Sequence, residues 1–418
     1  MPERFLQTTE AGYTMKQPHM QKPFNQIQRN LVHRAALGLT ALALAFSGCT
    51  AANDQQAAAA VTEPETMKTA MVYVGTYAEP DAESIFLYSL NPETGELTRV
   101  RGMKGGENPS YLALSPDKRH LYAVNETTEY EGEKSGAVSA FAVGEQGDSL
   151  HLLSKAASKG GAPCYVSLQG NTVLVANYVG GNVTAYPVQE NGQLGEGNTV
   201  QHQGTGPNAK RQDAPHAHFI APSPDGKYSF AVDLGADKVF AYKLQEGRLV
   251  PHAPAVAYAA APGSGPRHLA FHPNGKYAYL IHELNSTVTA LAYNAAHGTF
   301  TELQTLGTLP PDFEGESYPA AVKVSPDGKF LYGSNRGHNS MVVYAIDEAA
   351  GKLTLVQHVS TGGDWPRDFS IDPSGRVLLV ANQRSDNITS FKIDTATGKL
   401  TATGHEAQVQ KPVNLVFR

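Results

Sequence analysis

The segment "QDAPHAHFIAPSPDG" contains two histidines, His216 and His218, separated by a single residue. Imidazole titrates near neutral pH, so a histidine at a site can accept or donate a proton. Strand residues two apart point to the same face, which would also suit two ligands of one metal ion. Nothing in the sequence identifies a third ligand, so we expect no metal. We predict that His216 is catalytic and that His218 lies deeper, packed against the inner strands.

A second pair of chemically active residues is Arg267 and Glu283, which are 16 residues apart. That spacing corresponds to two strands and a turn, so the two side chains should face each other across a hairpin. One interpretation is a salt bridge that only holds the hairpin. An exposed pair contributes only about 0 to 1 kcal/mol, however, and a buried pair at an opening is better explained by anion binding.

These residues belong to a unit that recurs along the chain: a proline, an apolar strand, a turn such as "SPDG" and three further strands. The prolines that open the units lie 46 to 54 residues apart and are Pro109, Pro163, Pro215, Pro266, Pro319, Pro366 and Pro412. A unit of about fifty residues has the size of a four-stranded propeller blade. The sequence therefore predicts an all-β fold, a seven-bladed β-propeller.

The two ends of the repeated region complete each other. The region opens on "MVYVGTY", which resembles a second strand, and closes on "KPVNLVF", which resembles a first strand. One blade is therefore expected to combine both termini. Pairing these strands would close the ring and remove two exposed sheet edges.

The register of the strands predicts a site at one opening of the ring. The first strand of each unit runs away from one face and the second returns, so the residue after each proline meets the end of its own second strand. The residues after the prolines are Ser110, Cys164, His216, Arg267, Ala320, Arg367 and Val413. The return ends carry Thr76, Tyr77, Asn125, Glu126, Asn177, Tyr178, Asp233, His282, Glu283, Asn335, Arg336, Asn382 and Arg384. A polar set around one opening is typical of a small-molecule site.

Cys164 stands among these residues and invites a role as nucleophile. No partner base is indicated beside it, so we interpret it as a small wall residue.

Composition limits the kinds of molecule that the protein is expected to bind. A net charge of -6 provides no basic stripe for nucleic acid. No internal apolar run of the repeated region is long enough to cross a bilayer, and a closed propeller favours a monomer.

The first 49 residues are expected to be a bacterial lipoprotein-type signal segment. Basic residues precede the apolar run "AALGLTALALAF", which is followed by "SGC" ending at Cys49. "FSGC" resembles a lipobox, with Phe46 where Leu is usual, and would make Cys49 the lipidated residue that anchors an exported protein in a membrane, facing the periplasm or the cell surface. The alternative is an ordinary signal peptide with an incidental cysteine. Residues 50–70 should be a flexible tether and residues 71–418 the propeller.

Several runs resemble those of the seven-bladed lactonase family: "PHAHFIAPSPDGKYSFAVDLGADKVFAY", "GPRHLAFHPNGKYAYLIHELNSTVTAL", "SNRGHNSMVVYAI" and "WPRDFSIDPSGRVLLVANQRSDNITSFKI". That family includes the propeller-type 6-phosphogluconolactonases and the fungal carboxy-muconate lactonising enzymes. The resemblance extends from about Met71 to the C-terminus. It implies an active site built from His216 or His218, together with Arg267, Glu283 and Arg336.

Lactone hydrolysis needs no cofactor, but it needs a base for water and a fixed positive charge for the oxyanion. We predict Glu283 or His216 as the base and Arg267 as the oxyanion partner, acting on an acidic sugar lactone of the 6-phosphogluconolactone type. The predicted substrate-binding residues are Arg336, His218, His268, Arg367, Arg384 and Asn382. Two alternatives remain open: closure of an unsaturated diacid to a lactone, and a non-catalytic, membrane-anchored binding propeller.

Overall fold

The structure, a computed structural model, describes residues 69–418. Within this range the chain forms strands and turns only, and it contains no helix that could cross a membrane. The predicted signal segment, Cys49 and nearly all of the predicted tether lie outside the described residues.

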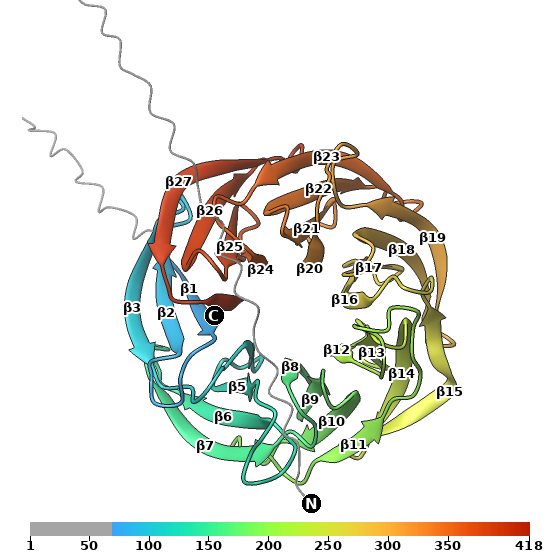
Figure 1. The fold of residues 1–418 in the computed structure, drawn as a ribbon. Helices are drawn as coiled ribbons and strands as arrows, with labels where there is room; N and C mark the ends of the chain where they lie inside the picture. Colours follow the sequence, from blue (N-terminus) through green and yellow to red (C-terminus); the bar gives the residue numbers. More distant parts are fainter. Residues whose placement is uncertain (1–68) are drawn as a thin grey trace, which may run out of the picture. The chain divides into compact units, whose positions relative to one another are not determined.

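The strands form seven four-stranded antiparallel sheets arranged around a central opening, so the predicted seven-bladed propeller is confirmed (Figure 1). The innermost strands are β4 (Tyr111–Leu114), β8 (Pro163–Gln169), β12 (Ala217–Pro222), β16 (Pro266–Phe271), β20 (Tyr318–Val324), β24 (Pro366–Ile371) and β28 (Pro412–Phe417). The second strands are β1 (Ala70–Thr76), β5 (His120–Asn125), β9 (Thr172–Asn177), β13 (Ser229–Asp233), β17 (Tyr277–His282), β21 (Phe330–Arg336) and β25 (Val377–Asn382).

The two outer layers follow in the same order. The third strands are β2 (Ile85–Leu90), β6 (Ala137–Val143), β10 (Asn182–Pro187), β14 (Lys238–Gln245), β18 (Thr287–Asn294), β22 (Ser340–Ile346) and β26 (Asn387–Ile393). The outermost strands are β3 (Leu97–Met103), β7 (Leu150–Ala157), β11 (Asn198–Gln201), β15 (Arg248–Ala259), β19 (Thr299–Gly307), β23 (Leu353–Ser360) and β27 (Leu400–Gln408).

One blade is built from both ends of the described chain, as predicted. β28 pairs with β1 in an antiparallel register that runs from Val72 opposite Phe417 to Thr76 opposite Pro412. The ring is therefore closed by backbone hydrogen bonds between its first and last strands, which leaves neither strand as an open edge on that side.

The apolar core lies between neighbouring blades. In one such layer Phe219, Phe230 and Val232 pack against Leu280 and Phe300 of the following blade. Alternate strand residues point to opposite faces of a sheet, so each blade contributes one apolar face to each of its two neighbours. This packing makes the ring rigid and holds the innermost strands at fixed positions around the centre.

Tyrosines of the second strands add a polar link between blades. In four blades a tyrosine hydroxyl donates to the carbonyl of the glycine in the turn before the outermost strand of the next blade: Tyr73 to Gly147 (2.6 Å), Tyr122 to Gly192 (3.2 Å), Tyr279 to Gly351 (3.2 Å) and Tyr332 to Gly398 (3.0 Å). These glycines adopt positive φ, for example 77° at Gly147, a conformation that side chains with a Cβ disfavour.

Candidate active site

A β-bulge in the innermost strands determines which side chains line the centre of the ring. Pro266 pairs with His282, whereas His268 already pairs with Ile281, so Arg267 is the extra residue. The same shift occurs at Cys164, His218 and Arg367 in their own blades. Bulges near active sites re-aim a side chain that regular alternation would point elsewhere.

His218, and not His216, therefore occupies the position of Arg267 in its blade. Both residues lie five positions before the first residue of the hairpin turn, Ser223 in one blade and His272 in the other. Pro215 lies two residues further from its turn than Pro266 does, so counting from the proline misaligned this blade. The predicted equivalence of His216 with Arg267 is wrong.

His216 lies instead at the rim of the opening. Its ring stacks on Tyr178 with centroids 4.6 Å apart, and Nδ1 lies 3.0 Å from the Tyr178 carbonyl oxygen. Its backbone N–H donates to Asp233, which also holds His202 at 2.6 Å. Nε2 lies 3.4 Å from Asp213 Oδ1, so both ring nitrogens face an oxygen that only accepts.

The ends of the second strands divide into two kinds of position. The residue paired with the proline points into its own blade: the Asn382 amide donates to Thr389 at 3.2 Å, and His282 Nε2 lies 2.9 Å from Thr289 Oγ1. The next residue along the chain points to the opposite face of the sheet. We call these seven residues the exit ring: Tyr77, Glu126, Tyr178, Leu234, Glu283, Arg336 and Gln383. Asn382, predicted to bind substrate, thus has its amide bound within its blade.

Glu283 of the exit ring is bound by three guanidinium groups. Arg336 Nη2 donates to Oε2 at 2.6 Å, and Arg267 Nε lies 3.1 Å from the same oxygen as an ion pair without hydrogen-bond alignment. Arg211 Nη2 donates to Oε1 at 2.5 Å. Arg267 and Glu283 thus face each other as predicted, whereas Arg211, in the segment between β11 and β12, was not foreseen.

Burial and neighbouring charges define the electrostatics of this cluster. The carboxylate of Glu283 is only 4 % exposed; burial opposes its charge, but Arg336, Arg267 and Arg211 together hold its pKa far below the usual range. Burial, with Arg336 and Arg367 nearby, lowers the pKa of Arg267 to about 9, so Arg267 remains charged at neutral pH. Three cations thus surround one anion, which leaves two positive charges in excess.

Two neutral imidazoles lie beside Arg267. Nη1 of Arg267 is 3.3 Å from Nε2 of His268, and the rings of His268 and His218 are 5.2 Å apart. Burial and the nearby Arg267 hold the pKa of both histidines well below the usual value. Below them, the rings of Tyr111 and Tyr165 complete an aromatic layer, with Tyr165 5.2 Å from His268.

A second carboxylate belongs to the exit ring. Glu126 Oε2 accepts hydrogen bonds from Ser110 Oγ at 2.5 Å and Tyr77 OH at 2.9 Å. Arg367 Nη2 lies 3.8 Å from Oε1, and its guanidinium stands over the Tyr77 ring at 5.4 Å. From the sequence, Glu126 is predicted only as a residue at the return end of a second strand, although its position there matches that of Glu283.

Trp365 joins two further arginines at the rim. The Arg384 guanidinium lies 3.4 Å from the centre of the Trp365 ring and that of Arg336 lies 5.5 Å away. Trp365 has φ of 65°, a strained value for a bulky side chain. Its backbone N–H donates to Asn339 and its carbonyl accepts from Gln383, which hold this conformation.

Cys164 is buried at the same level as His218 and Arg267. Its Sγ lies 3.7 Å from the Ala217 carbonyl and 3.8 Å from the His218 carbonyl. Burial raises the thiol pKa, so the sulfur stays protonated and is a poor nucleophile at neutral pH. The geometry is that of a wall residue.

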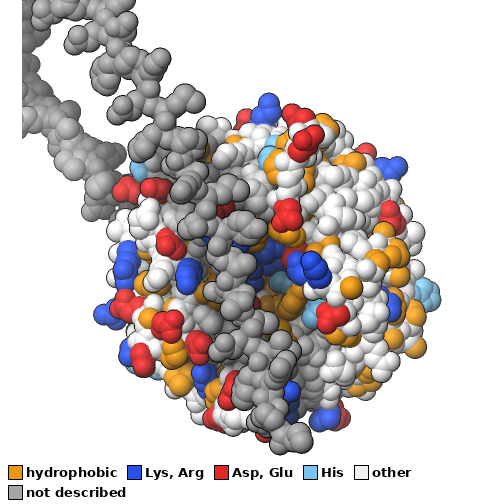
Figure 2. All heavy atoms as spheres, in the orientation of Figure 1, with side chains coloured by type: hydrophobic (Ala, Val, Ile, Leu, Met, Phe, Trp, Pro, Cys, Tyr) orange, Lys and Arg blue, Asp and Glu red, His pale blue; other side chains and the backbone are white. Residues whose placement is uncertain are grey.

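Figure 2 shows Lys and Arg side chains, in blue, gathered in the hollow at the centre of the face it views. Beside the exit ring, a groove of about 660 Å³ is lined by Lys210, Arg211, Asn285, Ser286 and Tyr318. Among residues 69–418 no cluster of three or more His, Cys, Asp or Glu has the arrangement of a metal site.

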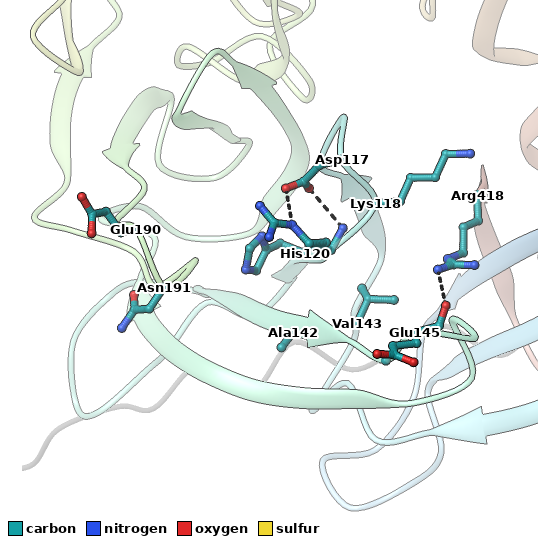
Figure 3. Close-up of a pocket in the computed structure, with 11 residues that line it drawn as sticks. Asp117, Lys118, His120, Ala142, Val143, Glu145, Glu190, Asn191 and Arg418 are labelled. Carbon is teal, nitrogen blue, oxygen red and sulfur yellow. Dashed lines mark hydrogen bonds and ion pairs between the residues drawn. The ribbon is translucent and has the colours of Figure 1, made fainter.

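Another pocket, of about 500 Å³, lies at the turn ends of the strands, away from the exit ring (Figure 3). Some of its charged groups already pair within the protein: Asp117 pairs with Arg119 at 2.7 Å, and Arg418 donates to the Glu145 carbonyl at 3.0 Å. The excess positive charge at the exit ring therefore makes that end the better candidate active site.

A family model described as "Lactonase, 7-bladed beta-propeller" matches residues 71–417. The chain belongs to this family. A 6-phosphogluconolactonase of Bacillus subtilis is 38 % identical over 296 residues, covering 70 % of this chain and 82 % of the relative. Among solved structures, the periplasmic gluconolactonase PpgL of Pseudomonas aeruginosa has a TM-score of 0.78 at 36 % identity, covering 84 % of this chain and 99 % of its own.

Another similar solved structure is that of a protein from Lactobacillus plantarum, with a TM-score of 0.77, 35 % identity and coverage of 84 % of this chain and 99 % of its own. Membership in the lactonase family agrees with the fold and with a buried, arginine-rich site.

Proposed function

We propose that the protein hydrolyses an acidic sugar lactone of the 6-phosphogluconolactone type at the exit ring. The observation that carries this proposal is the buried cluster in which Arg211, Arg267 and Arg336 surround Glu283 and leave an excess of positive charge. Such a site attracts an anionic substrate and stabilises negative charge that develops during reaction. The relatives named as lactonases support the same reaction class.

Arg267 is assigned to the oxyanion that forms when water adds to the lactone carbonyl. Its Nη1 is bound to the Ala320 carbonyl at 2.5 Å and its Nε faces Glu283, while no described residue accepts from Nη2. A rigidly held donor in a water-poor site stabilises developing charge without reorganising. Glu283 serves to hold the arginines in place, because its own low pKa makes it a weaker base than the sequence indicated.

The acidic group of the substrate is assigned to the arginines nearer the rim. Arg336 is held by Glu283 and by the Tyr318 carbonyl at 2.9 Å, and no described residue accepts from its Nη1. Arg384 is exposed and lies over Trp365, while Arg211 borders the polar groove. Guanidinium groups bind phosphate or carboxylate through paired hydrogen bonds.

The test is hydrolysis of six-carbon sugar δ-lactones with and without a 6-phosphate, measured as acid release against the spontaneous rate. We expect the purified protein to accelerate the reaction and the variant Arg267→Ala to lose about a hundredfold in kcat. Arg248→Ala, on the outermost strand and exposed, is the matched control. No acceleration with any lactone would overturn the proposal.

We also propose that the protein is exported and anchored through lipid on Cys49, and that it acts as a monomer. The N-terminal sequence supports the anchor, and a periplasmic gluconolactonase among the similar structures is consistent with lactonase chemistry outside the cytoplasm. Mass spectrometry of the mature protein tests the anchor, because an unmodified chain cleaved elsewhere would contradict it.

A further inference from the structure

The proposed hydrolysis needs a proton acceptor for water, and Glu283 does not suit this task. Both of its carboxylate oxygens are occupied by guanidinium groups at 2.5 to 3.1 Å. The same positive charges that bind the substrate therefore keep this carboxylate ionised and remove its affinity for a proton.

Glu126 is the other acid of the exit ring and is bound asymmetrically. Ser110 and Tyr77 both donate to Oε2, whereas the nearest cation, Arg367 Nη2, is 3.8 Å from Oε1. That distance exceeds a hydrogen bond. Oε1 therefore keeps a lone pair available to a water molecule, and the side chain is 17 % exposed.

The fold places this free oxygen across the central opening from the arginine cluster. Figure 1 shows β5, which Glu126 follows, and β17, which Glu283 follows, on opposite sides of the opening. The backbone N–H of Glu126 donates to Asn108 at 3.0 Å, as that of Glu283 donates to Gly265 at 2.7 Å. The two carboxylates thus enter the centre at the same level of the ring.

Cys164, on β8, belongs to a blade that lies between the blade of Glu126 and that of Glu283 around the ring. Besides burial, its thiol senses the charges of Glu126, Arg267, Arg367 and Glu283. A lactone whose carbonyl oxygen binds Arg267 would have Glu126 on the other side of the central opening.

We propose that Glu126 is the general base of lactone hydrolysis, an assignment that rests on the proposed function. Glu126 Oε1 takes a proton from water as the water oxygen bonds to the carbonyl carbon, and the carbonyl oxygen becomes an oxyanion beside Arg267. The ring C–O bond then breaks, and Glu126 returns the proton to the leaving ring oxygen. The product is the open hydroxy acid, and the carboxylate of Glu126 is regenerated.

The experiment compares Glu126→Gln and Glu126→Ala with the wild type on the lactone that the wild type hydrolyses fastest. Loss of a general base lowers kcat by about a hundredfold or more with a smaller effect on KM. Formate should restore part of the activity of Glu126→Ala, because it can supply the missing carboxylate. Glu129→Gln, on the exposed segment after β5, is the matched control and should keep wild-type rates.

The formate rescue separates proton transfer from a merely structural role, because formate supplies a carboxylate without restoring the packing of the side chain. Tyr77→Phe removes one of the two hydrogen bonds that orient Glu126, so it should lower kcat with little change in KM. Thermal unfolding of each variant checks that the fold is kept. Wild-type kcat in a folded Glu126→Gln would overturn this assignment and leave the proposed function standing, whereas a wild type inactive on all lactones would overturn both.

Discussion

At the scale of single residues, the site is defined by which buried polar atoms lack a protein partner. His218 Nδ1 is buried and has no hydrogen-bond partner among the described residues, whereas His216 Nδ1 lies near the Tyr178 carbonyl. Buried polar groups are nearly always hydrogen-bonded, so an orphaned atom beside Arg267 indicates a partner that arrives with substrate or water. His218 is therefore the stronger candidate for contact with the reacting molecule.

We expect His218→Gln to lower kcat/KM about tenfold or more, which corresponds to about 1.4 kcal/mol, and His216→Gln to have a smaller effect. The reason is that His218 holds the position in its blade that Arg267 holds in the next blade, whereas His216 stacks on Tyr178 at the rim. Steady-state kinetics on both variants, with thermal unfolding as a control for folding, decide the matter. A folded His218→Gln with normal kinetics beside an inactive His216→Gln would reverse the assignment.

The ion cluster also predicts how stability depends on pH. The pKa of Glu283 is depressed in the folded protein relative to the unfolded chain, so its contribution is complete above about pH 4.3, the unfolded pKa. It is lost as the pH falls through the folded pKa. Glu283→Gln should therefore lower stability at neutral pH by about 3 to 5 kcal/mol, because three cations lose their anion.

The check is thermal unfolding between pH 7 and pH 3. The difference in unfolding temperature between the wild type and Glu283→Gln should become smaller as the pH falls below about 4.3. Below this pH the unfolded wild-type chain takes up a proton at Glu283, which reduces the stability that the ionised carboxylate contributes. Arg248→Ala serves as a surface control. If the difference in unfolding temperature stayed constant or grew at lower pH, Glu283 could not be ionised as described.

At the scale of elements, the hairpin between β4 and β5 keeps its shape although its turn sequence differs from that of the other blades. The sequence "SPDK" leads one to expect a less regular turn than "SPDG", but Lys118 takes φ of 60° beside 67° at Gly226, and both residues donate to the serine carbonyl of their turn. The turn is kept, and the strain is borne by Lys118, which is labelled in Figure 3. A lysine in the left-handed region costs about 1 kcal/mol or more relative to glycine.

Lys118→Gly should therefore stabilise the protein by about 0.5 to 1 kcal/mol, after allowing for the greater flexibility of glycine in the unfolded chain. Lys118→Ala keeps a Cβ at the same φ and should bring no comparable gain. Chemical denaturation of both variants measures the difference. Equal stabilisation by alanine and glycine would mean that the effect comes from the lost charge.

At the scale of the whole molecule, closure of the ring depends on the last few residues. Val413 and Leu415 of β28 are each 2 % exposed. Asn414 accepts from the Leu112 N–H at 3.0 Å and donates to Asp368 at 2.9 Å, which links β28 to both neighbouring blades. β28 is thus part of the inner wall rather than a terminal extension.

Truncation after Gln410 should lower the unfolding temperature by more than ten degrees and promote aggregation, because it removes buried apolar area and exposes the edge of β1. A chain that begins at residue 69 and keeps β28 should melt close to the intact protein. Thermal unfolding with light scattering compares the two. A truncated chain with an unchanged melting curve would contradict the role of β28 in closure.

The sequence by itself determined the number of blades, the mixed terminal blade and the pairing of Arg267 with Glu283. Each of these depends on local signals: prolines and turn glycines at a regular spacing, and two strands joined by a short hairpin. The hairpin involves residues within one repeat, whereas the mixed terminal blade follows from the phase of the repeats at the two ends of the region.

Only the tertiary structure decided which histidine lies at the centre and which residues complete the charged cluster. Pro215 lies two residues further from its hairpin turn than Pro266 does, so counting from Pro215 placed His216 where the structure has His218. Arg211 meets Glu283 from 72 residues away. A contact of that kind depends on how blades close around an axis, which no spacing within a repeat encodes.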